Sequence, residues 1–127
     1  YGIQGGMGLQ RGVLLYMDHR HTEGKICEVI LAEYFLRHDH YVFIPIAGQG
    51  PADLIVINGV TAEVILLDAK KDCFRHVKDR PVYHRIHRKR TPIQKKLGVR
   101  MAYVNIDTRE VHIVPPLEGF GQAEITK

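Results

Sequence analysis

Residues 51–70 read PADLIVINGVTAEVILLDAK, two apolar runs rich in β-branched residues that are separated by Asn58-Gly59. Asn-Gly between such runs is a strong short-range signal for a β-hairpin. A loop of two to four residues from Asn58 to Thr61 predicts paired positions whose residue numbers sum to between about 117 and 120. This register places Asp53 beside residues 64–67, within about two residues of Asp68.

Three charged side chains, Asp53, Asp68 and Lys70, lie at the ends of these two runs. Side chains alternate between the faces of a strand, so Asp68 and Lys70 share a face. Two close carboxylates repel each other unless a cation lies between them, and Mg²⁺ binds through one or two carboxylates and keeps bound water. A neighbouring lysine can orient or deprotonate that water, or neutralise charge on a phosphate. The alternative is a pair of strands that end in solvated charges.

Good helix formers without an internal proline predict a helix over about residues 22–38. The helix is apolar around most of its circumference, which predicts that it is largely buried. Glu33 has Arg37 as an i,i+4 partner, whereas Glu28 has no charged residue four positions away. An unpaired carboxylate on a packed helix face is costly, so Glu28 is a candidate third acid. The alternative is that Glu28 extends to solvent at the edge of the helix.

Four short motifs follow one another along the chain: Glu28 on the first helix, Pro51-Ala52-Asp53, Asp68-Ala69-Lys70 and residues 90–99. Their order and spacing resemble the PD-(D/E)XK nuclease superfamily over about residues 20–114. In several branches of that family a glutamine on the helix after the lysine contributes to the site, which corresponds here to Gln94. The chain departs from the usual pattern in two places. Ala52 is inserted between Pro51 and Asp53, and Asp68 replaces the commoner glutamate, which shortens the reach to a metal by one methylene.

The resemblance implies an α/β fold with a restriction-endonuclease-like core, a central mixed β-sheet flanked by helices. It implies hydrolysis of DNA phosphodiester bonds that depends on Mg²⁺, with Mn²⁺ able to substitute, and a 5′-phosphate product. Asp53, Asp68 and the Ala69 carbonyl would hold the metal, and Glu28 would bind a second metal or its water shell. Lys70 would position the attacking water, and Gln94 would bind a phosphate or Lys70 itself.

The substrate class follows from size and from the same resemblance. Compact relatives include the archaeal-type Holliday junction resolvases, which are homodimers, and the small stand-alone VRR-NUC nucleases of phages. A homodimeric nuclease selective for branched DNA is therefore expected, with residues 13–16 and the tail after Pro116 as candidates for subunit exchange. The alternatives are a restriction or repair nuclease of the same superfamily, and a DNA-binding module with the nuclease fold but no activity.

Positive charge is concentrated in one segment. Residues 70–100 contain 12 of the 18 Lys and Arg residues but only 2 of the 14 Asp and Glu residues. A basic segment beside an acidic metal site suits a polyanion that must reach the metal. Phosphate contacts of this kind give affinity without sequence reading. The predicted DNA contacts are Arg75, Lys78, Arg80, Arg85, Arg88, Lys89, Arg90, Lys95 and Lys96.

Composition predicts one domain with a single core, since the 127 residues are 45% hydrophobic. The expected organisation is an extension over 1–16, a core over 17–114 and a tail over 115–127. No apolar run reaches membrane-spanning length and no signal-peptide pattern is seen, which predicts an intracellular protein of a prokaryote or a phage-infected host, without a membrane partner or small-molecule cofactor. The expected strands cover 41–45, 53–58, 62–70, 99–106 and 110–114. A basic connection and a helix over 92–97 lie between the third and fourth strands.

Overall fold

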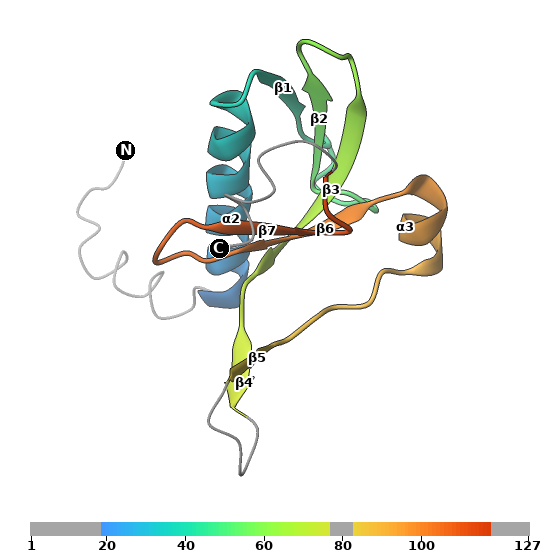
Figure 1. Ribbon diagram of the computed structural model, residues 1–127. Coiled ribbons are helices and arrows are strands. Elements are labelled where there is room, and N and C mark those ends of the chain that lie inside the picture. The colour runs from blue at the N-terminus through green and yellow to red at the C-terminus, as the bar shows by residue number, and fades with distance from the viewer. Residues whose placement is uncertain (1–18, 77–82, 118–127) are drawn as a thin grey trace, which may run out of the picture.

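A computed structural model describes residues 19–76 and 83–117, with the backbone alone at 74–76 and 83–85 (Figure 1). Helix α2 (His19–Leu36) is followed by strands β1 (His40–Phe43), β2 (Leu54–Asn58) and β3 (Val64–Lys71). Strands β4 (Phe74–His76) and β5 (Tyr83–Arg85) come next, then helix α3 (Pro92–Leu97), β6 (Arg100–Val104) and β7 (Val111–Val114). The basic connection therefore contains a short strand pair, β4 and β5.

Five strands form one mixed sheet in the order β1-β2-β3-β6-β7. Neighbouring strands are antiparallel except β3 and β6, which are parallel because the chain crosses over through β4, β5 and α3. Helix α2 packs along one side of the sheet, and α3 lies on the other side (Figure 1). The predicted α/β class with a mixed sheet is confirmed.

Helix α2 is buried along one face only. Cys27, Ile30, Leu31 and Phe35 are buried in the core against the sheet. The opposite face is open, and Val29 is 66% exposed. The prediction that this helix is largely buried is therefore wrong, because the sheet covers a single side of it. The core also extends past the predicted boundary at residue 114, since Leu117 is buried within it.

The β2–β3 register differs from the predicted one by a residue. Leu54 pairs with Leu67, one position beyond the predicted range, because the loop covers four residues between the bonded pair Asn58 and Glu63. The Asn58 side chain accepts hydrogen bonds from two loop N–H groups, and Ala62 adopts a left-handed φ of 65° that closes the turn. Because the loop begins one residue later than predicted, Asp53 lies at the upper end of the predicted range, with its N–H bonded to the Leu67 carbonyl, next to Asp68.

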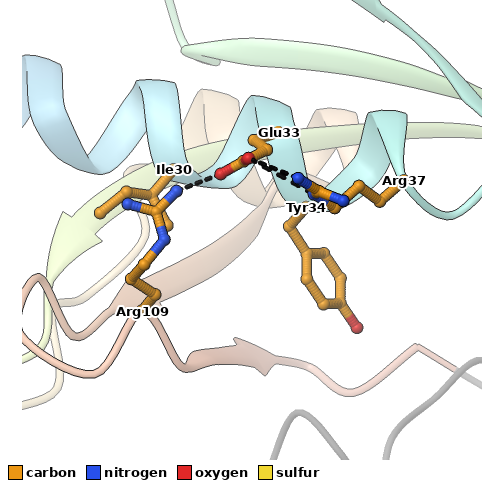
Figure 2. Close-up of a pocket in the computed structure, with 5 residues that line it drawn as sticks. All are labelled: Ile30, Glu33, Tyr34, Arg37 and Arg109. Carbon is orange, nitrogen blue, oxygen red and sulfur yellow. Dashed lines mark hydrogen bonds and ion pairs between the residues drawn. The ribbon is translucent and has the colours of Figure 1, made fainter.

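The β6–β7 turn repeats the same local chemistry. Asn58-x-x-Thr61-x-Glu63 and Asn105-x-x-Thr108-x-Glu110 share the asparagine cap and a left-handed fifth residue, which is Arg109 (φ 67°) in the second turn. This conformation directs Arg109 to α2, where its guanidinium pairs with Glu33 (Figure 2). The predicted pair of Arg37 and Glu33 is also formed, at 3.1 Å. Together these bonds lower the pKa of Glu33 and tie the turn to the helix beside a pocket of about 250 Å³.

The sheet face opposite α2 has two parts. Towards β1 it is apolar and open, with Tyr41, Phe43, Ile55 and Val64 between 37% and 64% exposed. Towards β3 it carries the charged side chains of the hairpin. No helix in the described part of the chain is both long enough and apolar enough to cross a membrane.

Candidate metal centre

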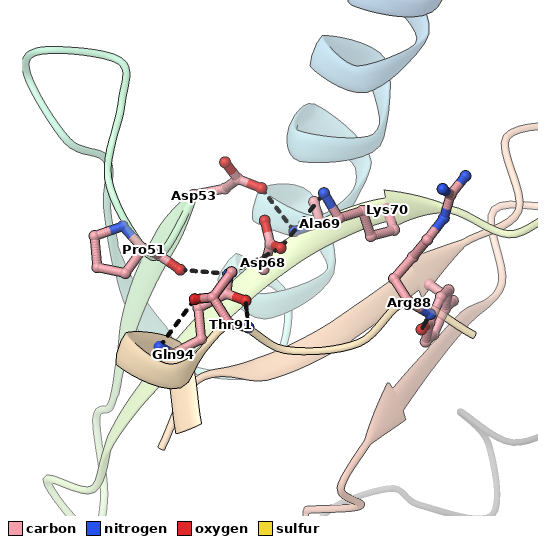
Figure 3. Close-up of polar contacts among 9 residues, drawn as sticks. Pro51, Asp53, Asp68, Ala69, Lys70, Arg88, Thr91 and Gln94 are labelled. Atoms are coloured by element: carbon pink, nitrogen blue, oxygen red, sulfur yellow. Dashed lines mark hydrogen bonds and ion pairs between the residues drawn. The ribbon is translucent and has the colours of Figure 1, made fainter. Parts of the chain in front are cut away.

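Asp53 is attached to the end of β3 through both its backbone and its side chain. Its N–H donates to the Leu67 carbonyl at 2.8 Å, and its Oδ2 accepts the Ala69 N–H at 2.8 Å (Figure 3). Strand β3 continues past the start of β2, so the Asp53 carboxylate takes the place of a strand partner at Ala69. The N–H and C=O of one strand residue point to the same side, so the Ala69 carbonyl faces the Asp53 side as well.

Asp68 and Lys70 follow on the same strand and share a face. Asp68 is buried, with 8% of its surface exposed. The Lys70 Nζ lies 3.5 Å from the Asp68 Oδ2, and the lysine side chain is 40% exposed. The ammonium group therefore lies between a buried carboxylate and solvent, where a phosphate can approach it. The structure brings Asp53, Asp68 and Lys70 together, as the hairpin predicted.

Gln94 connects three parts of this site. Its Nε2 donates to the Asp68 Oδ2 at 3.1 Å and to the Pro51 carbonyl at 2.9 Å (Figure 3). Its Oε1 accepts the Thr91 N–H at 2.9 Å, and the Thr91 hydroxyl accepts the Gln94 N–H, which forms a capping box on α3. Both Nε2 hydrogens are thus engaged. The amide thus holds Asp68 and Pro51 and not Lys70, and its predicted contact with a phosphate stays a prediction.

Glu28 differs from its predicted state. The side chain is not unpaired, because Lys25 lies one helical turn earlier and its Nζ is 3.5 Å from the Glu28 Oε1. Its charge still acts on Asp53, whose proton affinity it raises. Within residues 19–76 and 83–117, no three His, Cys, Asp or Glu side chains converge as a metal-binding group. Two carboxylates remain at the end of β3, those of Asp53 and Asp68. Mg²⁺ sites commonly use one or two protein carboxylates.

The electrostatics of the pair favour a bound cation. Burial, a hydrogen bond between the two carboxyl groups and the charges of Asp68 and Glu28 raise the pKa of Asp53 from 3.8 to about 7, against the opposing Ala69 hydrogen bond. Without a cation, the folded protein therefore holds a proton on Asp53 that the unfolded chain releases near pH 4. The stabilising contribution of this proton is complete below about pH 4 and is lost as the pH rises through about 7. A divalent cation held by the two carboxylates would replace this proton.

We therefore expect stabilisation by Mg²⁺ to increase with pH. The metal competes with the proton on Asp53, so the rise in Tm on adding Mg²⁺ should be larger at pH 8 than at pH 5.5. Differential scanning fluorimetry measures this directly. Asp53→Asn should abolish the pH dependence of the shift, and Asp107→Asn, at an exposed turn position, should retain it. An equal shift at both pH values in the wild type would contradict the assignment.

The predicted DNA contacts have different surroundings. Arg88, Lys89, Lys95 and Lys96 are exposed. The Arg90 guanidinium donates to the Val99 carbonyl at 3.1 Å, so this arginine also holds the segment that follows α3, and its predicted contact with DNA stays a prediction. Lys78 and Arg80 lie outside the described residues, and Arg75 and Arg85 are described by backbone alone.

No family model, curated protein or solved structure matches the chain.

Proposed function

We propose that the protein is a Mg²⁺-dependent endonuclease that hydrolyses phosphodiester bonds in DNA, built on a restriction-endonuclease-like core. The observation that carries this proposal is the convergence of Asp53, Asp68 and Lys70 at the end of β3, with Gln94 holding one of the two acids. A packed strand end does not require two adjacent carboxylates. Their repulsion has to be offset by a proton or a cation.

Each residue has a defined part in the proposed chemistry. Asp53, Asp68 and the Ala69 carbonyl would hold the metal, which would supply a Lewis acid for the phosphate and activate water for attack. Lys70 orients the attacking water or neutralises charge that develops on the phosphate oxygens. Glu28 acts at longer range, on the water shell or a second metal, because Lys25 already engages its carboxylate.

DNA is the proposed substrate because the site adjoins the basic segment. Lys95 and Lys96 lie in the last turn of α3, and Arg88 and Lys89 lie in the connection that leads to this helix. Gln94 belongs to the same helix, so α3 connects Lys95 and Lys96, which would bind phosphate, with Asp68 of the acidic site. Mn²⁺ should replace Mg²⁺, since both prefer carboxylate and water oxygens.

A homodimer selective for branched DNA is the proposed form of the enzyme. A four-way junction has two symmetry-related strands, and a two-fold dimer offers two sites related in the same way. The apolar side chains of β1, β2 and β3 that the monomer leaves exposed support self-association. The alternatives are a restriction or repair nuclease and a DNA-binding module without activity. The intact acid pair with its lysine favours an enzyme over the last of these.

Three assays test this function. Purified protein is incubated with a four-way junction, a nicked duplex and a linear duplex, each with Mg²⁺ and with EDTA. We expect cleavage only with Mg²⁺ and junction binding at least about tenfold tighter than duplex binding, or 1.4 kcal/mol. Light scattering should give a mass near twice 14.5 kDa. Cleavage in EDTA would overturn the metal mechanism, and a monomer that cuts all three substrates equally would overturn the junction preference.

The exposed basic residues should determine the salt dependence of DNA binding. The triple variant Arg88→Ala, Lys89→Ala, Lys96→Ala should weaken binding to every duplex sequence alike. Each lost phosphate contact should reduce the slope of log K against log salt by roughly 0.9. Fluorescence anisotropy over a salt series measures this slope. Arg37→Ala, immediately after α2 and paired with Glu33, is the matched control and should leave the slope unchanged. The same slope in the triple variant would show that this surface does not contact DNA.

A further inference from the structure

Tyr103 lies beside the candidate site and has no part in the chemistry described above. It is 1% exposed within β6, where it pairs with Lys70 across the parallel β3–β6 ladder. Paired residues of neighbouring strands project from the same face of a sheet. The ring of Tyr103 therefore lies next to the Lys70 side chain, on the face that carries Asp68.

The Tyr103 hydroxyl holds the basic connection to the sheet. Its oxygen accepts the Arg88 N–H at 2.6 Å (Figure 3). A buried tyrosine needs a partner for its hydroxyl, and here the partner belongs to residues 86–91, which form no helix or strand. The Ile86 N–H bonds to the Cys73 carbonyl at the start of this segment, and the Thr91 cap fixes its end. Between Ile86 and Thr91, the hydrogen bond from the Arg88 N–H to Tyr103 attaches the backbone of this segment to the sheet.

The attachment determines where one exposed charge lies. The Arg88 guanidinium extends to the same side of β3 and β6 as the Lys70 ammonium (Figure 3). A shift of the Arg88 backbone would move this guanidinium relative to Lys70. Such a shift would weaken a contact between this guanidinium and a bound phosphate, because a charge-assisted hydrogen bond depends on the geometry of its donor and acceptor.

We propose that Tyr103 is a positioning residue for DNA, an inference that rests on the nuclease function proposed above. Its hydroxyl fixes the Arg88 backbone so that the guanidinium binds a DNA phosphate next to the one on which Lys70 and the two acids act. Tyr103 itself touches neither the metal nor the DNA. Its effect on the reaction passes through Arg88, and so it should alter substrate binding without altering the chemical step.

Tyr103→Phe tests this role because it retains the ring and removes only the hydroxyl. We expect KM for DNA cleavage to rise about tenfold and kcat to stay within about twofold of wild type. Arg88→Ala should likewise raise KM and leave kcat nearly unchanged. The double variant should have the same KM as Arg88→Ala alone, since both changes remove the same contact between the Arg88 guanidinium and a DNA phosphate. Tyr34→Phe, in α2 on the other side of the sheet, removes a hydroxyl away from the site and is the matched control that should leave both constants unchanged.

Amide hydrogen exchange gives a readout independent of cleavage. The Arg88 amide should be protected in the wild type and should exchange faster in Tyr103→Phe, while the amides of β6 remain protected. This inference would be overturned if the two single variants had additive effects on KM, or if the Arg88 amide were unprotected in the wild type. Neither result would contradict the nuclease function. A wild-type protein that neither binds nor cuts DNA would overturn both. If Tyr103→Phe fails to fold, wild-type exchange and the KM–kcat split in Arg88→Ala decide the question.

Discussion

Asp68→Asn should reduce DNA cleavage by at least about 10³-fold, because loss of a metal-binding charge removes several kcal/mol of transition-state stabilisation. The asparagine has the same size and still accepts the Gln94 hydrogen bond, so the fold around the site should survive. DNA affinity should stay within about threefold of wild type, because the exposed basic side chains provide the phosphate contacts. Steady-state cleavage with Mg²⁺ and anisotropy with EDTA separate the two effects.

The same cleavage assay includes a matched control and three further variants of the candidate site. Asp107→Asn makes an identical change at an exposed turn and should leave cleavage unaltered. Asp53→Asn and Lys70→Ala should be as damaging as Asp68→Asn. Glu28→Gln should cost less, since its carboxylate is already paired with a lysine. Full turnover by Asp68→Asn would refute the assignment of the site.

Gln94→Leu should lower both activity and stability, since it removes a buried amide with three hydrogen-bond partners. Leaving the Asp68 carboxylate and the Pro51 carbonyl without their donor should reduce the free energy of unfolding by about 1–3 kcal/mol. Loss of orientation at a metal ligand typically costs about 10- to 100-fold in metal affinity or activity. Thermal denaturation and cleavage with Mg²⁺ measure the two effects on the same protein.

Gln94→Glu distinguishes the two functions of this side chain. A glutamate keeps the acceptor of the capping box with Thr91, so α3 should still begin in the same place. It cannot donate to Asp68 and adds a negative charge beside it, so cleavage should fall at least as far as in Gln94→Leu. Ile93→Ala, at the preceding and exposed position, is the control for the helix. Normal cleavage by Gln94→Glu would show that the amide serves α3 alone.

The elements that the sequence predicted well are those determined by local chemistry. Apolar runs bounded by turn residues define β2, β3, β6 and β7, and the observed strands lie within or beside the predicted ranges. Thr91, Pro92 and Gly98 predict the short helix α3, whose bounds agree with the prediction because a cap, a fixed φ and a left-handed stop act within a few residues.

Register was less predictable because it depends on the conformation of a few loop residues. Asn58-Gly59 predicted a loop of two to four residues that begins at Asn58, yet Asn58 pairs with Glu63. Its side chain caps a four-residue loop over residues 59–62, closed by Ala62 in a left-handed conformation. Alanine gives no sign of that conformation. The signal that was missed is the repeat of Asn-x-x-Thr-x-Glu at residues 58–63 and 105–110, which form equivalent turns.

The linear pattern was sufficient to select the acids and the lysine of the site, because alternation along one strand decides which side chains share a face. Tertiary packing decided the rest. The environment of Glu28 depends on which side of α2 meets the sheet, and the partners of Gln94 depend on how α3 lies against Pro51 and Asp68. Tyr103 and Arg88 meet only because β6 pairs in parallel with β3. Such contacts join residues 15 to 43 positions apart, and no local propensity encodes them.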